Sequence, residues 1–412
     1  MALYTDGVFA GMESIMEGDV EINNEVQVPA EETAEGISDA IDNEETAAEG
    51  SEVVEEAEAE EVKDQMIANN FNIMLNMYDV AKTRGIDSTF LALFDRDGGL
   101  SRMVNVRFPS CESMDAIGNP NSSYSQAFVA AMEADDGIFH KIWEWIKKVC
   151  VKVRDFLVRV WDWVASAFGS LTRKIGNLNK RINDGIKKKE AEDLKDAKTK
   201  VYKKDELNKA FAKYQGTIAD LISGCGVAIK NGAGVIMTGI TNASGARASM
   251  GGADKDTRKK KKDELKKTIN ELKDVVKKVD KEEVKSEQAL DSTGMKALLK
   301  TASTCVEQVA RNKQEIQTAK MTTDQARQAA ERASQMSTGR SLTHAEVKPY
   351  QDAASDMAKY GSIITSAVAL GPKIANMACQ IVAGHLSAFY VPANKQNASP
   401  ESSDIKRNSI NV

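Results

Sequence analysis

The sequence predicts an all-α protein: an antiparallel bundle of long helices that follows a largely disordered, acidic N-terminal segment. Apolar residues recur at alternating steps of three and four positions through much of the chain after residue 138, which is the spacing of helices that pack along a seam. Only 7 of the 412 residues are proline, and no series of alternating β-branched residues indicates strands. Acidic and basic side chains are also segregated along the chain, which separates the N-terminal segment from the rest.

The net charge of the chain reverses at residue 133. Residues 1–133 contain 28 acidic and 6 basic side chains, a net charge of −22. The remaining residues contain 33 acidic and 49 basic side chains, a net charge of +16, so the overall value of −6 conceals two oppositely charged parts. A body with this positive charge is expected to attract DNA without sequence preference and in a salt-dependent manner.

The acidic part is predicted to divide at residue 62. The first 62 residues contain 20 acidic side chains, no basic ones and few large apolar ones, so residues 1–62 are expected to be disordered. No secretory signal is expected, because a basic region is lacking there. Residues 63–133 begin with apolar residues at helical spacing and continue into turn-rich sequence, which predicts a small helical segment.

Residues 134–171 are predicted to form a basic amphipathic helix that begins after the capping residues Asp135-Asp136-Gly137. Its polar face includes Lys147 and Lys148. This helix could lie in the core, pack on another protein or lie on a membrane surface; the heptad spacing of its apolar stripe favours protein packing. The helix contains all four tryptophans of the chain: Trp143, Trp145, Trp161 and Trp163.

The rest of the chain is predicted to contain a connector, a bundle and a tail. Residues 172–206 are rich in lysine and expected to be helical and partly exposed, whereas residues 392–412 are expected to be disordered. Residues 207–391 are expected to form a bundle of four long helices, with seams that begin at Leu207, Leu265 and Met295. A capping box at Thr343 is expected to start the fourth helix, and Gly371-Pro372 is expected to bend or split it.

The sequence does not indicate an enzyme. It lacks a phosphate-binding loop, a zinc-protease motif and a nucleophile elbow, and the glycines between 224 and 234 lie within a helical pattern, where they favour close helix packing. The five cysteines are far apart and are interpreted as buried free thiols. The three histidines lack ligand spacing, so no metal or cofactor is expected, and His385 is expected in the core. No uninterrupted apolar run reaches the about 18 residues of a membrane-spanning helix.

Small-x-Glu tripeptides are candidate proteolytic processing sites. Ala131-Met132-Glu133 precedes Ala134 at the point where the charge reverses, directly before the predicted helix. Ala47-Ala48-Glu49, followed by Gly50, is a possible secondary site, and Thr33-Ala34-Glu35 is a looser match. The position of the first tripeptide makes Glu133 the expected residue on the N-terminal side of the cut bond.

The residues around this junction resemble the internal head proteins of giant phiKZ-like tailed phages. The similar segments are Phe90–Asn121, Ser125–Glu133 (SQAFVAAME) and Gly137–Lys148 (GIFHKIWEWIKK), so the resemblance covers about residues 88–150. It implies an acidic propeptide that a viral prohead protease removes after a small-x-Glu motif, and a helix that follows the cut. It also implies a location in the capsid interior, reached from the host cytoplasm during assembly.

Together, these features predict a non-enzymatic virion protein that is matured by removal of residues 1–133. The expected partners are the prohead protease, capsid or other inner-head proteins, packaged DNA and a second copy of the chain. The alternative is a membrane-active or membrane-peripheral helical protein that enters the host with the phage DNA. A third possibility is a host-directed effector or a DNA-condensing factor.

Overall fold

The structure of this protein is a computed structural model. It describes residues 44–87, 90, 94, 118–134, 137–185, 197–201, 204–238, 255–279, 283–287, 290–336 and 344–387. Several features predicted from the sequence lie outside these residues: the tripeptide at 33–35, the capping residues Asp135, Asp136 and Thr343, Cys111, and the tail after residue 391.

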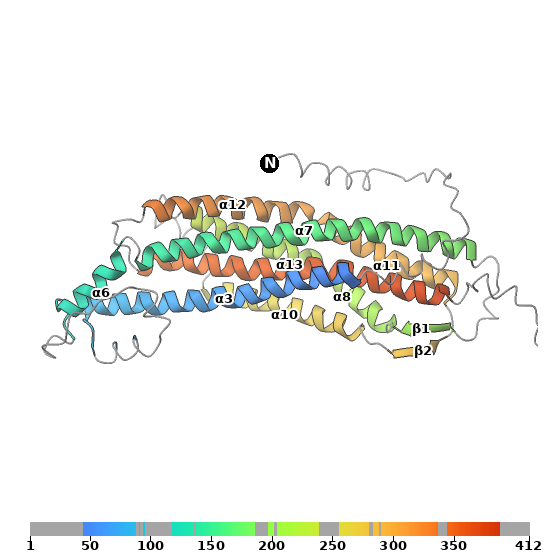
Figure 1. Ribbon diagram of the computed structural model, residues 1–412, viewed down its shortest axis with the longest axis horizontal. Helices are drawn as coiled ribbons and strands as arrows, with labels where there is room; N and C mark the ends of the chain where they lie inside the picture. Colours follow the sequence, from blue (N-terminus) through green and yellow to red (C-terminus); the bar gives the residue numbers. More distant parts are fainter. Residues whose placement is uncertain are drawn as a thin grey trace, which may run out of the picture.

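The described residues form long helices that lie side by side along the longest axis of the molecule (Figure 1). This arrangement confirms the prediction of an all-α fold in which helices pack against one another. The helices are α3 (Glu44–Thr83), α6 (Ser123–Glu133), α7 (Ile138–Gly185), α8 (Lys204–Thr238), α10 (Lys255–Val279), α11 (Ser292–Arg311), α12 (Lys313–Met336) and α13 (His344–Ser387).

Helix α13 is the centre of the bundle and contacts α3, α7, α8, α10 and α11. It is buried along nearly its whole length, because alanine, glycine and serine on several of its faces let its neighbours approach closely. The helix continues through Gly371 and Pro372, so the prediction of a split there is wrong. Proline removes one backbone hydrogen bond, and the neighbouring helices hold this part of α13 in place.

Helices α7, α10 and α13 run in one direction, and α3, α8, α11 and α12 run in the other. The parallel arrangement of α7 and α13 follows from two contacts, Trp143 with Tyr350 and Lys174 with Asn376. The antiparallel arrangement of α3 and α13 follows from the pairs Glu58–Ser366 and Asn72–Lys348.

The seams predicted from apolar spacing lie in the core. On α8, Leu207, Tyr214 and Ile218 are fully buried, and Phe211 is half-buried against the core. The predicted third helix, from Met295 to residue 319, is instead two helices that meet at Asn312. The Asn312 side chain is buried, and its Nδ2 donates a hydrogen bond to the carbonyl oxygen of Gln308 at 2.7 Å.

Three predicted boundaries need correction. Helix α3 spans Glu44–Thr83, and its packed part begins at the buried Gly50, so the prediction of disorder up to residue 62 is wrong for residues 50–62. Helix α7 continues through Gly169 to Gly185, well into the predicted connector. Part of the connector is also a strand: β1 (Ala197–Val201) pairs antiparallel with β2 (Glu283–Glu287) in a two-stranded ribbon.

Helix α8 is long and apolar enough to cross a membrane by length and composition alone. About half of its apolar window is buried in the bundle, where α8 contacts α10, α11, α12 and α13. A core helix of a bundle meets the same criterion, because both need a long apolar surface.

We predict that Gly371→Ala destabilises the protein by about 1–3 kcal/mol. A Cβ atom at Gly371 would lie 2.5 Å from Tyr214 Oη and 2.9 Å from Val309 Cγ2, and the Tyr214 side chain is fully buried and has no room to move. Urea denaturation measures the effect. Gly234→Ala is the control, since nothing lies within 4 Å of its added Cβ, and it should stabilise α8 by up to about 1 kcal/mol. Equal effects of the two substitutions would contradict the close packing at Gly371.

Candidate functional site

The candidate cleavage site lies at the C-terminal end of α6. Ser122 caps this helix by accepting a hydrogen bond from the Ser125 backbone N–H at 3.2 Å. Phe128 and Met132 point into the core and are fully buried. Met132 and Glu133 are the last residues of the helix, and Ala134 is its exposed C-terminal cap.

The side chain of Glu133 is bound by α3. Its Oε1 accepts a hydrogen bond from the Tyr78 hydroxyl and forms an ion pair with Lys82 Nζ at 3.2 Å. Lys82 Nζ also donates to the Tyr78 oxygen at 2.8 Å. The hydrogen bond with Tyr78 and then that with Glu133 raise the pKa of Lys82 above its ordinary value of 10.5, although burial lowers it.

These contacts hold the candidate site in a closed form. The residues before the cut bond are helical, Met132 is buried, and Gly137 makes a tight turn in which its N–H donates to the Ala134 carbonyl oxygen at 2.8 Å. Proteolysis favours exposed, locally unfolded chain. A protease therefore needs the end of α6 to open, or has to act before this part has folded.

The possible secondary site at Ala47, Glu49 and Gly50 lies in the first turns of α3. Gly50 is buried, and a Cβ atom added to it would lie 2.2 Å from Cζ2 of Trp163. This helical segment is not an exposed loop, so cleavage there also requires local unfolding.

Helix α3 packs into the bundle along a heptad seam that contains two carboxylates. Its buried positions include Val53, Ala57, Glu61 and Asp64, at steps of four, four and three. Glu61 and Asp64 are 4% and 2% exposed. Acidic residues at seam positions hide the amphipathic pattern of α3, and for this reason the sequence predicts disorder where the structure has a helix.

Basic residues of α7 compensate the carboxylates on one side of α3. Lys152 Nζ lies 2.7 Å from Glu60 Oε2 and 3.0 Å from Asp64 Oδ1, and Arg159 Nη1 lies 2.7 Å from Glu56 Oε2. In addition, the Trp145 indole N–H donates a hydrogen bond to Asp64 Oδ1 at 3.3 Å.

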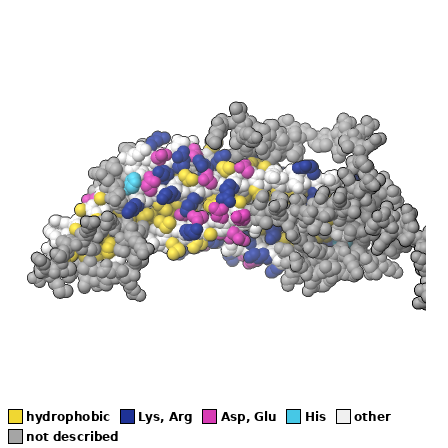
Figure 2. Space-filling model, in the orientation of Figure 1, with side chains coloured by type: hydrophobic (Ala, Val, Ile, Leu, Met, Phe, Trp, Pro, Cys, Tyr) yellow, Lys and Arg dark blue, Asp and Glu magenta, His cyan; other side chains and the backbone are white. Residues whose placement is uncertain are grey.

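Basic residues of α10 compensate the carboxylates on the other side of α3. Lys266 Nζ lies 2.9 Å from Glu61 Oε1, and Lys273 forms an ion pair with Glu58. The acidic helix therefore lies between two basic helices, with α13 beneath it. Figure 2 shows the result on one face of the molecule, where basic and acidic side chains are interleaved over the middle of the bundle.

The carboxyls of this interface have opposite pKa shifts. Burial raises the pKa of Asp64 above its ordinary value of 3.8, although hydrogen bonds from Lys152 and Trp145 lower it. The hydrogen bond from Lys152 lowers the pKa of the more exposed Glu60 below its ordinary value of 4.5. The two carboxyls therefore respond to acid in opposite ways.

The C-terminal half of α3 is held by apolar contacts. Met74, Leu75 and Tyr78 are almost fully buried. The ring of Phe71 lies 5.7 Å from that of Trp145, and the ring of Tyr78 lies 5.5 Å from that of Phe139, both edge to face. This half of α3 is part of the main core, in contrast to the acidic half.

The predicted amphipathic helix α7 is a core helix in this structure. Trp143, Trp145 and Trp161 are 3%, 5% and 6% exposed, and Trp163 is partly buried. Lys147 pairs with Glu144 on its own helix at 2.8 Å, and Lys148 is exposed. The four tryptophans and both lysines lie on one helix, as predicted. Trp143, Trp145 and Trp161 face the interior of the bundle.

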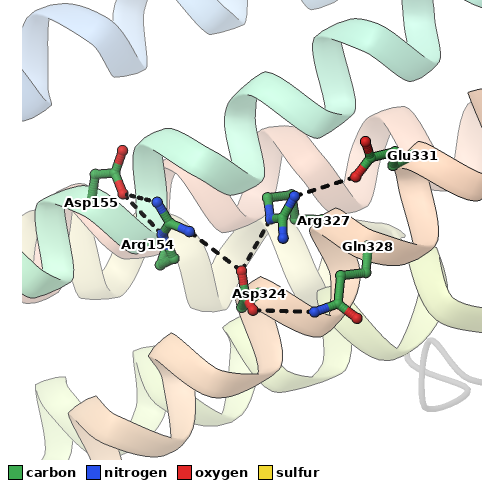
Figure 3. A network of polar contacts seen from close by, with 6 residues as sticks. All are labelled: Arg154, Asp155, Asp324, Arg327, Gln328 and Glu331. Atoms are coloured by element: carbon green, nitrogen blue, oxygen red, sulfur yellow. Dashed lines mark hydrogen bonds and ion pairs between the residues drawn. The ribbon is translucent and has the colours of Figure 1, made fainter. Parts of the chain in front are cut away.

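Helix α12 packs against α7 through a polar network (Figure 3). Arg154 of α7 lies between Asp155 at 2.6 Å and Asp324 of α12 at 3.4 Å. Arg327 joins Asp324 at 3.0 Å and Glu331 at 3.3 Å. The network links the two helices, and because its groups are partly exposed its net contribution to stability is small.

The interior contains no activated nucleophile among the cysteines that the structure describes. Cys150, Cys225, Cys305 and Cys379 are buried and free, as the sequence predicts. Burial raises the pKa of Cys150, Cys225 and Cys379 to about 12, which keeps these thiols protonated and unreactive. His385 is also buried, and its Nδ1 accepts a hydrogen bond from the Leu290 N–H at 3.4 Å.

No group of three potential metal ligands comes together within the described ranges. Comparison of the chain with protein-family models, with curated proteins and with solved structures finds no match.

We predict that Tyr78→Phe speeds cleavage after Glu133 by a glutamate-specific endoprotease about fivefold. The substitution removes one hydrogen bond that keeps the site closed, worth about 1 kcal/mol, and cleavage follows the population of the open form. Mass spectrometry measures the rate at which a fragment beginning at Ala134 appears. Tyr214→Phe is the control, because its buried hydroxyl makes no hydrogen bond within the described part of the chain. Equal rates for both variants would show that Tyr78 does not hold Glu133.

We predict opposite pH trends for Asp64→Asn and Glu60→Gln. The raised pKa of Asp64 means that the folded state binds this proton more tightly, so the stability advantage of the wild type over Asp64→Asn grows as the pH falls toward 3.8. The lowered pKa of Glu60 makes the advantage over Glu60→Gln shrink as the pH falls below 4.5. Urea denaturation at several pH values tests both trends, and parallel trends would contradict the opposite shifts.

Proposed function

We propose that this chain is a non-enzymatic phage virion protein that is packaged inside the capsid with DNA and matured by removal of an acidic propeptide after Glu133. The main support for the proposal is the acidic helix α3, which packs against α7, forms ion pairs with lysines of α10 and is linked to the basic body through one small-x-Glu motif. The resemblance of residues 88–150 to the internal head proteins of phiKZ-like phages supports the same function.

The charges of the two parts give the propeptide a physical role. Before cleavage, α3 neutralises cations of the body through ion pairs such as Arg159–Glu56 and Lys266–Glu61. After cleavage, residues 134–412 carry a net charge of +16, which is compatible with a capsid interior filled with DNA. The partners in this proposal are the prohead protease, other capsid or inner-head proteins, and DNA.

The second candidate is a membrane-active protein delivered with the DNA. The contacts of α3 with Phe139 and Trp145 favour it, since release of α3 would uncover both rings next to the basic residues of α7. Flotation of the processed protein with liposomes tests this function. A variant in which Phe replaces Trp145 should then float less well, because Trp favours the membrane interface.

We predict that mass spectrometry of purified virions detects peptides that begin at Ala134, with residues 1–133 depleted. The ratio of peptides from residues 1–133 to peptides from residues 134–412 measures the depletion, with the uncut purified chain as the reference for that ratio. Abundant peptides that span Glu133 and Ala134 would refute processing at this bond.

A further inference from the structure

The side chains of α7, α10 and α13 that contact the acidic half of α3 form a basic surface, which we call the α3 seat. Its cations lie in two rows, Lys152 and Arg159 on α7, and Lys266 and Lys273 on α10. The two cations of each row are seven positions apart, which is about 10.5 Å along a helix axis. The α3 seat therefore presents two facing rows of cations, with α3 between them.

The floor of the α3 seat is built from small residues of α13. Ala358, Gly361 and Ser362 line a small cavity against α3. Among residues 50–64 of α3, only Val53 and Ala57 are buried hydrophobic residues. The acidic half of α3 thus offers little apolar surface to the seat, although Val153 and Phe156 of α7 line the same cavity. Charge therefore supplies most of the complementarity between the seat and its occupant.

Two further lysines lie at the edge of the α3 seat, each paired with an aspartate. Lys359 of α13 is mostly buried, 3.7 Å from Asp263, and Lys262 pairs with Asp356 at 2.5 Å. Burial, followed by the charges of Lys266 and Lys262, lowers the pKa of Lys359 below its ordinary value of 10.5. The charge of Glu61 raises the pKa of Lys359, so an anion at this position of the seat favours the protonated lysine.

We propose that the α3 seat binds the phosphate backbone of DNA and that the acidic half of α3 blocks it as a built-in polyanion. Residues 44–64 contain ten acidic side chains and one basic one. As a helix, this segment carries one net negative charge per about 3.5 Å, close to the about 3.4 Å per phosphate along one DNA strand. The existing occupant therefore has the charge spacing of the proposed ligand.

The composition of the α3 seat favours DNA over a lipid surface. An interfacial membrane site needs a continuous apolar face that inserts between lipids, whereas this seat has two rows of cations along its sides, with Trp145, Phe156 and Trp163 of α7 beside them. The inference rests on the proposed function in one respect, since release of α3 by processing is what would open the seat in the virion.

Two charge-matched variants of the full-length chain test the inference. Glu56→Gln/Glu58→Gln removes the partners of Arg159 and Lys273, and Glu52→Gln/Glu55→Gln removes two exposed carboxylates from the same helix. Fluorescence anisotropy with a labelled duplex DNA measures the affinity. The first variant is expected to bind about fivefold more tightly than the second, with a salt dependence steeper by about 2, because two more cations are free to contact phosphates. Thermal unfolding checks that both variants are folded.

A second pair of substitutions assigns the gain to the α3 seat. In the Glu56→Gln/Glu58→Gln background, Arg159→Gln/Lys273→Gln should abolish the gain. Lys267→Gln/Lys277→Gln, on the exposed side of α10, should leave most of it. The full-length chain with a specific protease site at residues 134–137, cut under native conditions with both pieces retained, should bind DNA more tightly than the uncut chain.

Several outcomes would overturn the inference. Equal DNA affinity of the two glutamine variants would show that the carboxylates of Glu56 and Glu58 do not block a DNA-binding site. Binding of the cut chain to phosphatidylglycerol vesicles but not to DNA would assign the surface to membranes, and self-association without DNA binding would assign it to a second copy.

The test is independent of processing in the virion. A mature N-terminus at Ala134 without DNA binding would leave the proposed function in place and refute the seat. DNA binding by the variants, with no cleavage after Glu133 in the virion, would support the α3 seat and refute the proposed processing.

Discussion

The burial of α13 is the constraint on which the rest of the structure depends. A helix that is covered on nearly every side needs neighbours from most of the chain, and α13 contacts helices from both the N-terminal and the C-terminal parts. The hydrogen bond between Ser366 and Glu58 joins residues that are 308 positions apart. Because α13 follows in the sequence all the helices that it contacts, the bundle closes only after α13 has been made, and such non-local contacts form late in folding.

This central position explains why an acidic helix is part of the bundle. The face of α13 between α7 and α10, which α3 covers, has small residues. Helix α3 can therefore approach closely, and its charged side chains reach the basic helices on both sides. Replacing Glu61 by a larger apolar residue would fit the seam but remove the carboxylate that pairs with Lys266 of α10. Replacing Asp64 in the same way would leave Lys152 of α7 with one carboxylate, Glu60, where it now has two. Buried ion pairs contribute little net stability, whereas loss of one partner is costly. The main effect of these pairs is therefore to select an acidic helix for this position.

The sequence predicted those elements whose own residues contain the pattern. The seams of α7 and α8 follow from apolar spacing, because every seam position from Ile146 to Val160 and most from Leu207 to Cys225 is apolar. The acidic half of α3 could not be predicted in this way, since its seam is completed by Lys152 and Lys266, which lie about 90 and 200 positions away.

The remaining errors have local causes. The helix predicted to end at residue 171 continues as α7, because Gly169 costs only about 1 kcal/mol relative to alanine and the neighbouring Phe168 and Leu171 are buried in the bundle. Only Asn312 separates α11 from α12. The apolar spacing continues across this residue without a shift, and for this reason the sequence predicted one helix. At the candidate site, the tripeptide was visible in the sequence, but the binding of Glu133 by Tyr78 and Lys82 was not, because it depends on how α6 packs against α3.

The two halves of α3 differ in what holds them, and this difference determines what one cut after Glu133 can achieve. The cut turns the covalent link between α6 and α7 into a non-covalent one, and so removes the high effective concentration that keeps α3 in place. The apolar half, with Phe71, Leu75 and Tyr78, still resists release, because burial of each such side chain contributes about 1.5–3 kcal/mol. The acidic half has no comparable anchor, and salt or a competing polyanion weakens its ion pairs. The acidic half would therefore exchange first, and cleavage would uncover the basic surface before α3 leaves the bundle.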